Sequence, residues 1–239
     1  MSEMCRTILF LFTMFVTNTI QVITGFAGAM MAMPPAIKLV GVESAKAVVS
    51  IVSGISSLYV TVRYFKNIDW RELLKIVSLM GIGLLLGTWL FRQLAFDVLL
   101  KAYGVIVILT ALKKLFVHKE FQLPLWMMYL CLLTAGLIHG MFISGGSFLV
   151  VYAVWALKDK EKFRATVSAV WVVLNTYLLY DHYQNGYFTA KTLGLLPLSM
   201  IPFLCAAWLG SRLAKRISAE KFLLLTYCLL LLSGFIILI

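Results

Sequence analysis

Two short segments of the chain combine glycines with hydroxyl residues, and each is followed at once by a short apolar stretch. Residues 24–28 read Thr-Gly-Phe-Ala-Gly, and residues 144–147 read Ser-Gly-Gly-Ser. If a helix begins at each segment, its first backbone N–H groups and the positive end of its dipole face the glycines. Because glycine lets a ligand approach the backbone closely, this arrangement predicts a site for a small oxyanion. Glycine pairs also serve helix packing, and that alternative stays open.

Further polar residues lie near both segments. Gln21 and His139 occupy equivalent places just before them, and a polar side chain in an apolar span is a candidate for ligand contact. Hydroxyl and amide residues also stripe the spans that follow the glycines, where packing is an equally good explanation. The candidate substrate-binding residues are Asn18, Gln21, Thr24, Gly25, Gly28, Ser53, His139, Ser144, Gly145, Gly146, Ser147 and Asn175.

Two other classes of function use the same residues. Ser144 with His139 or His182 could form the nucleophile and base of an intramembrane hydrolase, with the glycine backbone as an oxyanion hole. No typical nucleophile motif surrounds this serine, so we do not expect an enzyme or any catalytic residue. A membrane subunit without transport activity, or a lipid-binding scaffold, is the third alternative; it predicts that the polar segments can be replaced without loss.

The elements that must position these residues are membrane helices. The chain has 239 residues, of which 62% are hydrophobic and 13% charged, and its mean hydropathy is +0.96. A soluble domain carries about 25% charged residues, so this composition indicates an integral membrane protein. Ten apolar runs follow one another along the chain, near 7–23, 26–40, 44–62, 73–91, 97–112, 123–142, 146–157, 163–181, 192–211 and 220–239.

Two of these runs are too short to cross a bilayer. At 1.5 Å per residue, the runs 26–40 and 146–157 reach about 18–23 Å, less than the ~30 Å hydrocarbon core. The first contains the pair Pro34-Pro35. Unpaired backbone groups are costly in lipid, so such breaks must be buried in protein or line a cavity. Broken helices of this kind form the substrate sites of transporters.

The chain repeats itself with a shift of 118 residues. Matching pairs include Gly28 with Gly146, Lys46 with Arg164, Ser50 with Ser168, and Asn67 with Asn185. We expect one transmembrane domain built from a repeat of about 1–119 and a repeat of about 120–239.

Basic residues indicate how the repeats are oriented. Cytoplasmic loops are rich in Lys and Arg. If the repeats are inverted, the 21 basic residues divide 15 to 6 between the two sides; if they are parallel, the division is 13 to 8. Inversion fits better, and it places the loops 63–75, 113–119, 158–164 and 212–221 inside.

Acidic residues and cysteines exclude several alternatives. All ten Asp and Glu residues fall in loops or at span ends, whereas cation porters usually need a carboxylate at membrane depth. The four cysteines are scattered and contain no Cys-x-x-Cys, so we expect neither a metal site nor a disulfide framework. We also expect no cofactor. A net charge of +11 spread over short loops indicates lipid headgroups and topology rather than nucleic acid.

The motifs resemble those of a known family. Gly25, Gly28 and Pro34 in the first repeat, and Gly140, Gly145 and Gly146 in the second, are similar to the glycine-rich motifs of the sulfite exporter TauE/SafE family, also described as the 4-toluene sulfonate uptake permease family. Tyr152 replaces the proline of the second motif. The resemblance implies a compact secondary transporter of sulfite, organosulfonates or similar small anions.

These observations define the expected protein. It is an all-α integral membrane protein of two inverted repeats, each a broken, re-entrant helical hairpin followed by three transmembrane helices. We expect a bacterial inner or plasma membrane location, a small anionic substrate and lipid as partners, and no nucleic acid; a homodimer is left open.

Single-cysteine labelling tests the orientation. With both termini outside and the loop 113–119 in the cytoplasm, a cysteine at His118 and a cysteine at the C-terminus should react from opposite sides of the membrane. Labelling of both from the same side would contradict the inverted arrangement.

Overall fold

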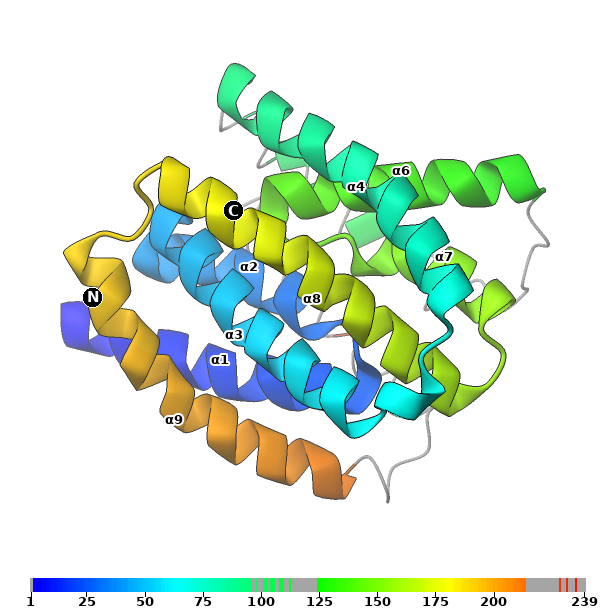
Figure 1. Cartoon of the computed structure of the whole chain (residues 1–239). Helices are drawn as coiled ribbons and strands as arrows, with labels where there is room; N and C mark the ends of the chain where they lie inside the picture. Colours follow the sequence, from blue (N-terminus) through cyan, green and yellow to red (C-terminus); the bar gives the residue numbers. More distant parts are fainter. Residues whose placement is uncertain are drawn as a thin grey trace.

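The computed structural model describes residues 2–95 and 124–213, together with isolated positions outside these ranges. Every regular element in the described residues is helical, as predicted (Figure 1). The helices are α1 (Glu3–Thr24), α2 (Gly28–Val40), α3 (Val42–Arg63), the short 3-10 helix η1 (Phe65–Asn67), α4 (Trp70–Gln93), α6 (Leu125–Phe142), α7 (Gly146–Ala156), α8 (Lys160–Gln184) and α9 (Ala190–Leu213).

Eight of the ten predicted apolar runs coincide with these helices. The other two, 97–112 and 220–239, are described only at isolated positions, and the loop 113–119 lies outside the described residues. These two runs correspond to the expected third transmembrane helix of each repeat.

Five of the helices, α1, α3, α4, α6 and α9, are long and apolar enough to cross a membrane. Their outward faces expose large apolar side chains such as Trp89, Ile201 and Leu204, each more than half exposed. An apolar exterior of this kind suits lipid rather than water. The chain is a multi-pass membrane protein.

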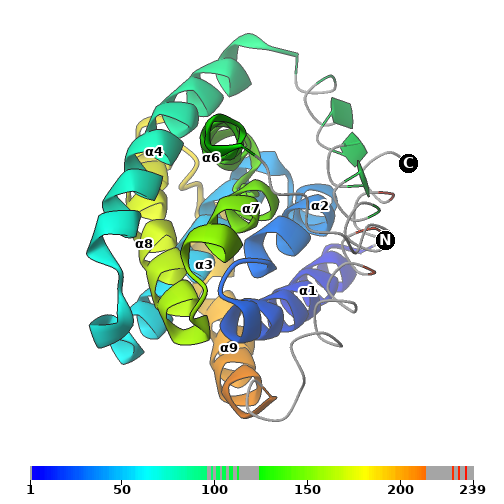
Figure 2. The ribbon, with the colours of Figure 1, turned by 90° about the vertical axis from the view of Figure 1, so that its right-hand side faces the viewer.

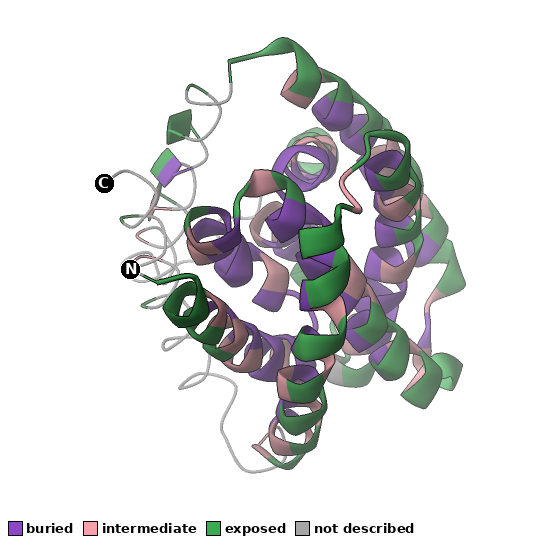
Figure 3. Ribbon diagram, turned by 90° about the vertical axis from the view of Figure 1, so that its left-hand side faces the viewer, coloured by how far each residue is buried: buried purple, intermediate pink, exposed green. Residues whose placement is uncertain are grey.

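Helices α3 and α8 pack together through the middle of the molecule (Figure 1). Helices α1 and α9 form a pair on one side of them, and α4 and α6 form a pair on the other (Figure 2). The short helix α2 packs against α1 and α3, and α7 packs against α6 and α8. The inner faces of these helices are buried (Figure 3), and both short helices begin inside the protein, with Gly28 and Gly146 buried. Only their far ends reach the exterior, at Lys38 and at Val154 and Trp155.

Side-chain bonds define two ends of this bundle. At one end, the residues after α3 meet the start of α8, where Asn67 donates to Glu161 over 2.5 Å. At the opposite end, Arg92 near the end of α4 forms an ion pair with Asp181 near the end of α8. Helices α3 and α8 thus run antiparallel. The loops 63–75 and 158–164, which the basic residues group on one side of the membrane, thus lie at the same end of the bundle.

Glycines of α4 allow it to approach α6 closely. A Cβ added at Gly83 would lie 2.1 Å from the Leu133 carbonyl oxygen, and one added at Gly87 would lie 2.1 Å from that of Leu137. Both distances are impossible for real atoms. Gly83 and Gly87 therefore form a small-residue face that serves helix packing.

We predict that Gly87→Ala destabilises the protein, because the new methyl group must push α4 away from α6. Overpacking of this kind costs about 1–3 kcal/mol, which thermal unfolding in detergent should register as a lower midpoint. Gly81→Ala in the same helix is the matched control, since nothing lies within 4 Å of its added Cβ. An unchanged midpoint for Gly87→Ala would contradict the close packing. Gly81→Ala therefore also serves as the neutral control variant in ligand experiments.

Candidate anion-binding site

The two interrupted helices end with the same backbone geometry. Helix α1 ends at Thr24, and Gly25 follows with a left-handed φ of 84° while its N–H donates to the Gln21 carbonyl over 2.7 Å. Helix α6 ends at Phe142, and Ile143 follows with a φ of 56° while its N–H donates to the His139 carbonyl over 2.8 Å. A β-branched residue rarely adopts this conformation, so the surroundings hold the second break in place.

The backbone of the first break, residues 25–28, is hydrogen-bonded by side chains. Gln21 Oε1 accepts from the Gly28 N–H over 2.8 Å, and Thr24 Oγ1 accepts from the Ala27 N–H over 3.3 Å. From α8, Trp171 Nε1 donates to the Gly25 carbonyl over 3.1 Å. The sequence suggested that Thr24 and Gln21 would contact a ligand; in the structure their oxygens bind the chain itself.

The glycines of the two breaks differ in what they face. A Cβ on Gly28 would lie 2.5 Å from the Thr17 carbonyl oxygen, and one on Gly145 would lie 2.1 Å from that of Ala135. These two glycines let each short helix pack against the arm that precedes it. Gly146 instead faces the other break, since its Cβ would lie 2.9 Å from the Phe26 carbonyl oxygen. The two breaks therefore meet at Phe26 and Gly146.

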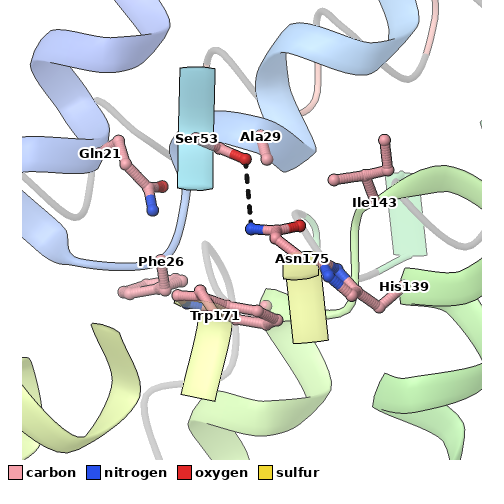
Figure 4. Close-up of a pocket in the computed structure, with 9 residues that line it drawn as sticks. Gln21, Phe26, Ala29, Ser53, His139, Ile143, Trp171 and Asn175 are labelled. Atoms are coloured by element: carbon pink, nitrogen blue, oxygen red, sulfur yellow. Dashed lines mark hydrogen bonds between the residues drawn. The ribbon is translucent and has the colours of Figure 1, made fainter. Parts of the chain in front are cut away.

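A small cavity lies where the breaks meet (Figure 4), and we call it the main cavity. The first turns of α2 and α7, which supply Ala29 and Gly146, both border it. Its free space holds about one water molecule. It is lined by Gln21, Phe26, Ala29, Ser53, His139, Ile143, Gly146, Trp171 and Asn175.

A second small cavity adjoins the main cavity, because Ala29 and Ser53 line both. Asn18 and Gly28 border this second cavity. The twelve predicted site residues thus divide into three groups. Five line the main cavity, with Ser53 shared, and two more line its neighbour. The remaining five, Thr24, Gly25, Ser144, Gly145 and Ser147, line neither.

Polar atoms that lack a normal hydrogen bond face the main cavity. Both ring nitrogens of His139 and the Oδ1 atom of Asn175 are buried without a hydrogen bond of normal geometry, although the two side chains lie close enough to interact with each other. Asn175 Nδ2 reaches Ser53 Oγ over 3.5 Å, at the outer limit of a hydrogen bond (Figure 4). The His139 ring lies against the Trp171 ring, with centroids 4.8 Å apart. Buried polar groups normally have partners, so these groups are available to a ligand.

The charge of the main cavity suits an anion. No residue that lines it is acidic, and its polar lining consists of amide, hydroxyl and imidazole groups. Imidazole and amide N–H groups can donate to an oxyanion, and the starts of α2 and α7 add the positive ends of two helix dipoles.

The serine–histidine pair of a hydrolase is not formed in the described residues. Neither nitrogen of His139 makes a hydrogen bond, and His182 is bonded through Nδ1 to Ser50 Oγ over 3.2 Å. Neither described histidine therefore makes the hydrogen bond to Ser144 that nucleophilic catalysis requires.

These elements define the class of protein: a multi-pass membrane protein with a buried polar site between two interrupted helices. Residues 9–237 match the family described as Sulfite exporter TauE/SafE, and the chain belongs to that family. Its members are membrane transporters rather than enzymes. No curated protein and no solved structure matches the chain.

Sequence reasoning missed four lining residues: Phe26, Ala29, Ile143 and Trp171. One signal was available for Trp171, since it lies 118 positions after Ser53, a predicted site residue. The position of Ile143 was also readable, because it is the repeat equivalent of Gly25. Phe26 and Ala29 carry no polar group and give no signal of their own.

We predict that Gln21→Met destabilises the first break. The buried Gly28 N–H loses its acceptor, and an unsatisfied buried donor costs about 1–3 kcal/mol. The apparent melting temperature in detergent should fall. Thr176→Val is the control, because that exposed hydroxyl bonds only to its own helix, at the Val172 carbonyl. Equal melting temperatures for Gln21→Met and the parent would contradict the role of Gln21.

Proposed function

We propose that the protein is a secondary transporter of small sulfur-containing or organic anions, such as sulfite or organosulfonates, and that the main cavity holds the oxyanion head. The observation that carries this proposal is the convergence of two helix starts on one cavity without carboxylates. His139 and Asn175 supply polar atoms there that lack hydrogen bonds of normal geometry. Family membership supports the same substrate class.

We also propose that the fold consists of two inverted repeats, each opening with a re-entrant hairpin. Residues 118 apart share the same role at both breaks. The backbone carbonyls of Gln21 and His139 accept from the N–H groups of Gly25 and Ile143, and both of these residues have a left-handed conformation. Each interrupted helix also packs against a helix of the opposite half: α1 against α9, and α6 against α4. These two pairs are equivalent if the halves are repeats. The antiparallel course of α3 and α8 supports inversion.

The size of the main cavity bears on the transport cycle. Space for about one water molecule does not admit an anion with three oxygens around sulfur. Loading therefore requires the two breaks to separate, and Phe26 and Gly146 mark the line along which they would part. Rocking of one half against the other is the usual way in which repeat-built transporters provide alternating access.

Flux into proteoliposomes tests the proposed function. Purified protein should carry labelled sulfite, and unlabelled sulfonates and small carboxylates should compete to different degrees. Binding of the transported anion should also raise the melting temperature, because a ligand that binds only the folded state stabilises it by mass action. Absence of flux and of any thermal shift with sulfite, sulfonates, sulfate and carboxylates would overturn the proposal.

We predict that His139→Leu and Asn175→Leu weaken anion binding while the protein stays folded. Each removes a hydrogen bond to a charged ligand worth about 1.5–3 kcal/mol, which corresponds to about 10- to 150-fold in affinity. The sulfite concentration needed to raise the melting temperature measures this change. Gly81→Ala should bind like the parent. Parent-like affinity in both leucine variants would place the anion elsewhere.

A further inference from the structure

Lys46 and Arg164 are equivalent basic residues, 118 positions apart, and each is the fifth residue of its helix, α3 or α8. Lys46 is only 1% exposed, and Arg164 is partly buried. Long basic side chains at span ends usually extend outward to the headgroups. These two turn inward instead.

Each of these cations binds the interrupted helix of the opposite half. Lys46 Nζ lies 3.5 Å from the Gly140 carbonyl oxygen in α6, and the Arg164 guanidinium donates to the Val22 carbonyl in α1. Val22 and Gly140 are themselves 118 positions apart. The same contact therefore occurs twice, once at each end of the bundle.

Aromatic rings complete both contacts. Lys46 Nζ lies 3.7 Å from the centroid of the Phe91 ring, and the Arg164 guanidinium carbon lies 5.0 Å from that of Tyr64. Such rings attract a cation weakly. They do not cancel its charge.

Neither cation forms an ion pair with a carboxylate in the part of the chain that the structure describes; Asp181 attracts Lys46 from beyond ion-pair distance and is itself paired with Arg92. The two ion pairs there join Lys75 to Glu72 and Arg92 to Asp181. Arg164 also buries Nε without a hydrogen-bond partner. A buried charge without a counter-charge is costly, and a small anion would supply the missing charge.

A row of side chains connects each cation to the main cavity. Lys46, Ser50 and Ser53 have the spacing i, i+4, i+7 and so lie along one face of α3. Seven residues of helix span about 10 Å. Ser53 lines the main cavity, and Ser50 between them is fully buried.

The row on α8 matches it and runs from the other end. Arg164, Ser168 and Trp171 have the same spacing, and Trp171 lines the main cavity. Ser168 Oγ is buried without a hydrogen-bond partner. Because α3 and α8 are antiparallel, the two rows approach the main cavity from opposite ends of the bundle.

We propose that Lys46 and Arg164 are two further anion-binding positions, one at each end of the pathway, where the small oxyanion pairs before entering or after leaving the main cavity. The inference rests on the proposed transport function. Pairing with the anion competes with the Gly140 or Val22 carbonyl for the same cation. Arrival of the anion therefore releases the interrupted helix at that end and allows the cavity to open there.

Transport measured separately from each membrane face tests this inference. Right-side-out and inside-out vesicles would be compared for initial rates of labelled sulfite uptake. Lys46→Gln should raise KM by about tenfold or more from the face where α3 begins, and much less from the other face. Arg164→Gln should do the reverse. By the distribution of basic residues, the Lys46 face is the outer one.

Matched variants separate this role from surface charge and from folding. Lys38→Gln and Lys162→Gln remove exposed lysines at the same two ends and should leave both KM values unchanged. Lys46→Arg and Arg164→Lys keep the charge and should stay close to the parent. Only variants with the parent's size-exclusion profile are compared; if Lys46→Gln lacks it, Lys46→Met replaces it, because that side chain keeps the length and fills the contact with Phe91.

The outcomes distinguish this inference from the proposed function. Suppose that the parent protein carries sulfite, but that KM in the glutamine variants is unchanged from both faces or raised equally from both. This result would overturn the role of Lys46 and Arg164 and leave the site at the main cavity unaffected. Parent protein that carries none of the tested anions would overturn both. An increase confined to one face for each variant, in opposite directions, is the expected result.

Discussion

Inside an apolar protein, the backbone groups of two interrupted helices must be hydrogen-bonded, and much of the structure meets this requirement. At the first break, Gln21 and Thr24 accept from backbone N–H groups, and Trp171 donates to a carbonyl. Lys46 and Arg164 donate to carbonyls near the ends of the opposite interrupted helices. Unpaired backbone in lipid costs several kcal/mol per group, so these side chains are fixed by folding before they serve any substrate.

Several of these partners come from the other half of the chain. Trp171 and Arg164 lie on α8 but bind α1 and the residue after it, and Lys46 lies on α3 but binds α6. Movement of one half against the other must therefore break bonds at a helix interruption. This links the shape of the cavity to the contacts at the two ends of the bundle. A transporter needs such a link, because the site must open to one side at a time.

Much of the helical architecture was predictable from residue type and spacing. Glycine marked the first break because Gly25 adopts a left-handed backbone, whereas at the second break that conformation belongs to Ile143, just before the glycines. The apolar runs marked eight helices. The particular role of Gly28 was not predictable: it lies against the arm that precedes it, and sequence cannot tell which neighbour a glycine faces. Lys46 and Arg164 were also missed, because a basic residue near a span end normally marks the membrane surface. Their inward course depends on packing between helices distant in sequence.

In the proposed function, one small oxyanion binds where the two breaks meet. Selenite has the shape and charge of sulfite, and its selenium scatters X-rays anomalously, so crystals grown with selenite would locate it directly. We predict an anomalous peak between the starts of α2 and α7, within hydrogen-bonding distance of His139 and Asn175. A peak only at the exterior of the protein, or none at a concentration that raises the melting temperature, would contradict an anion site between the two breaks.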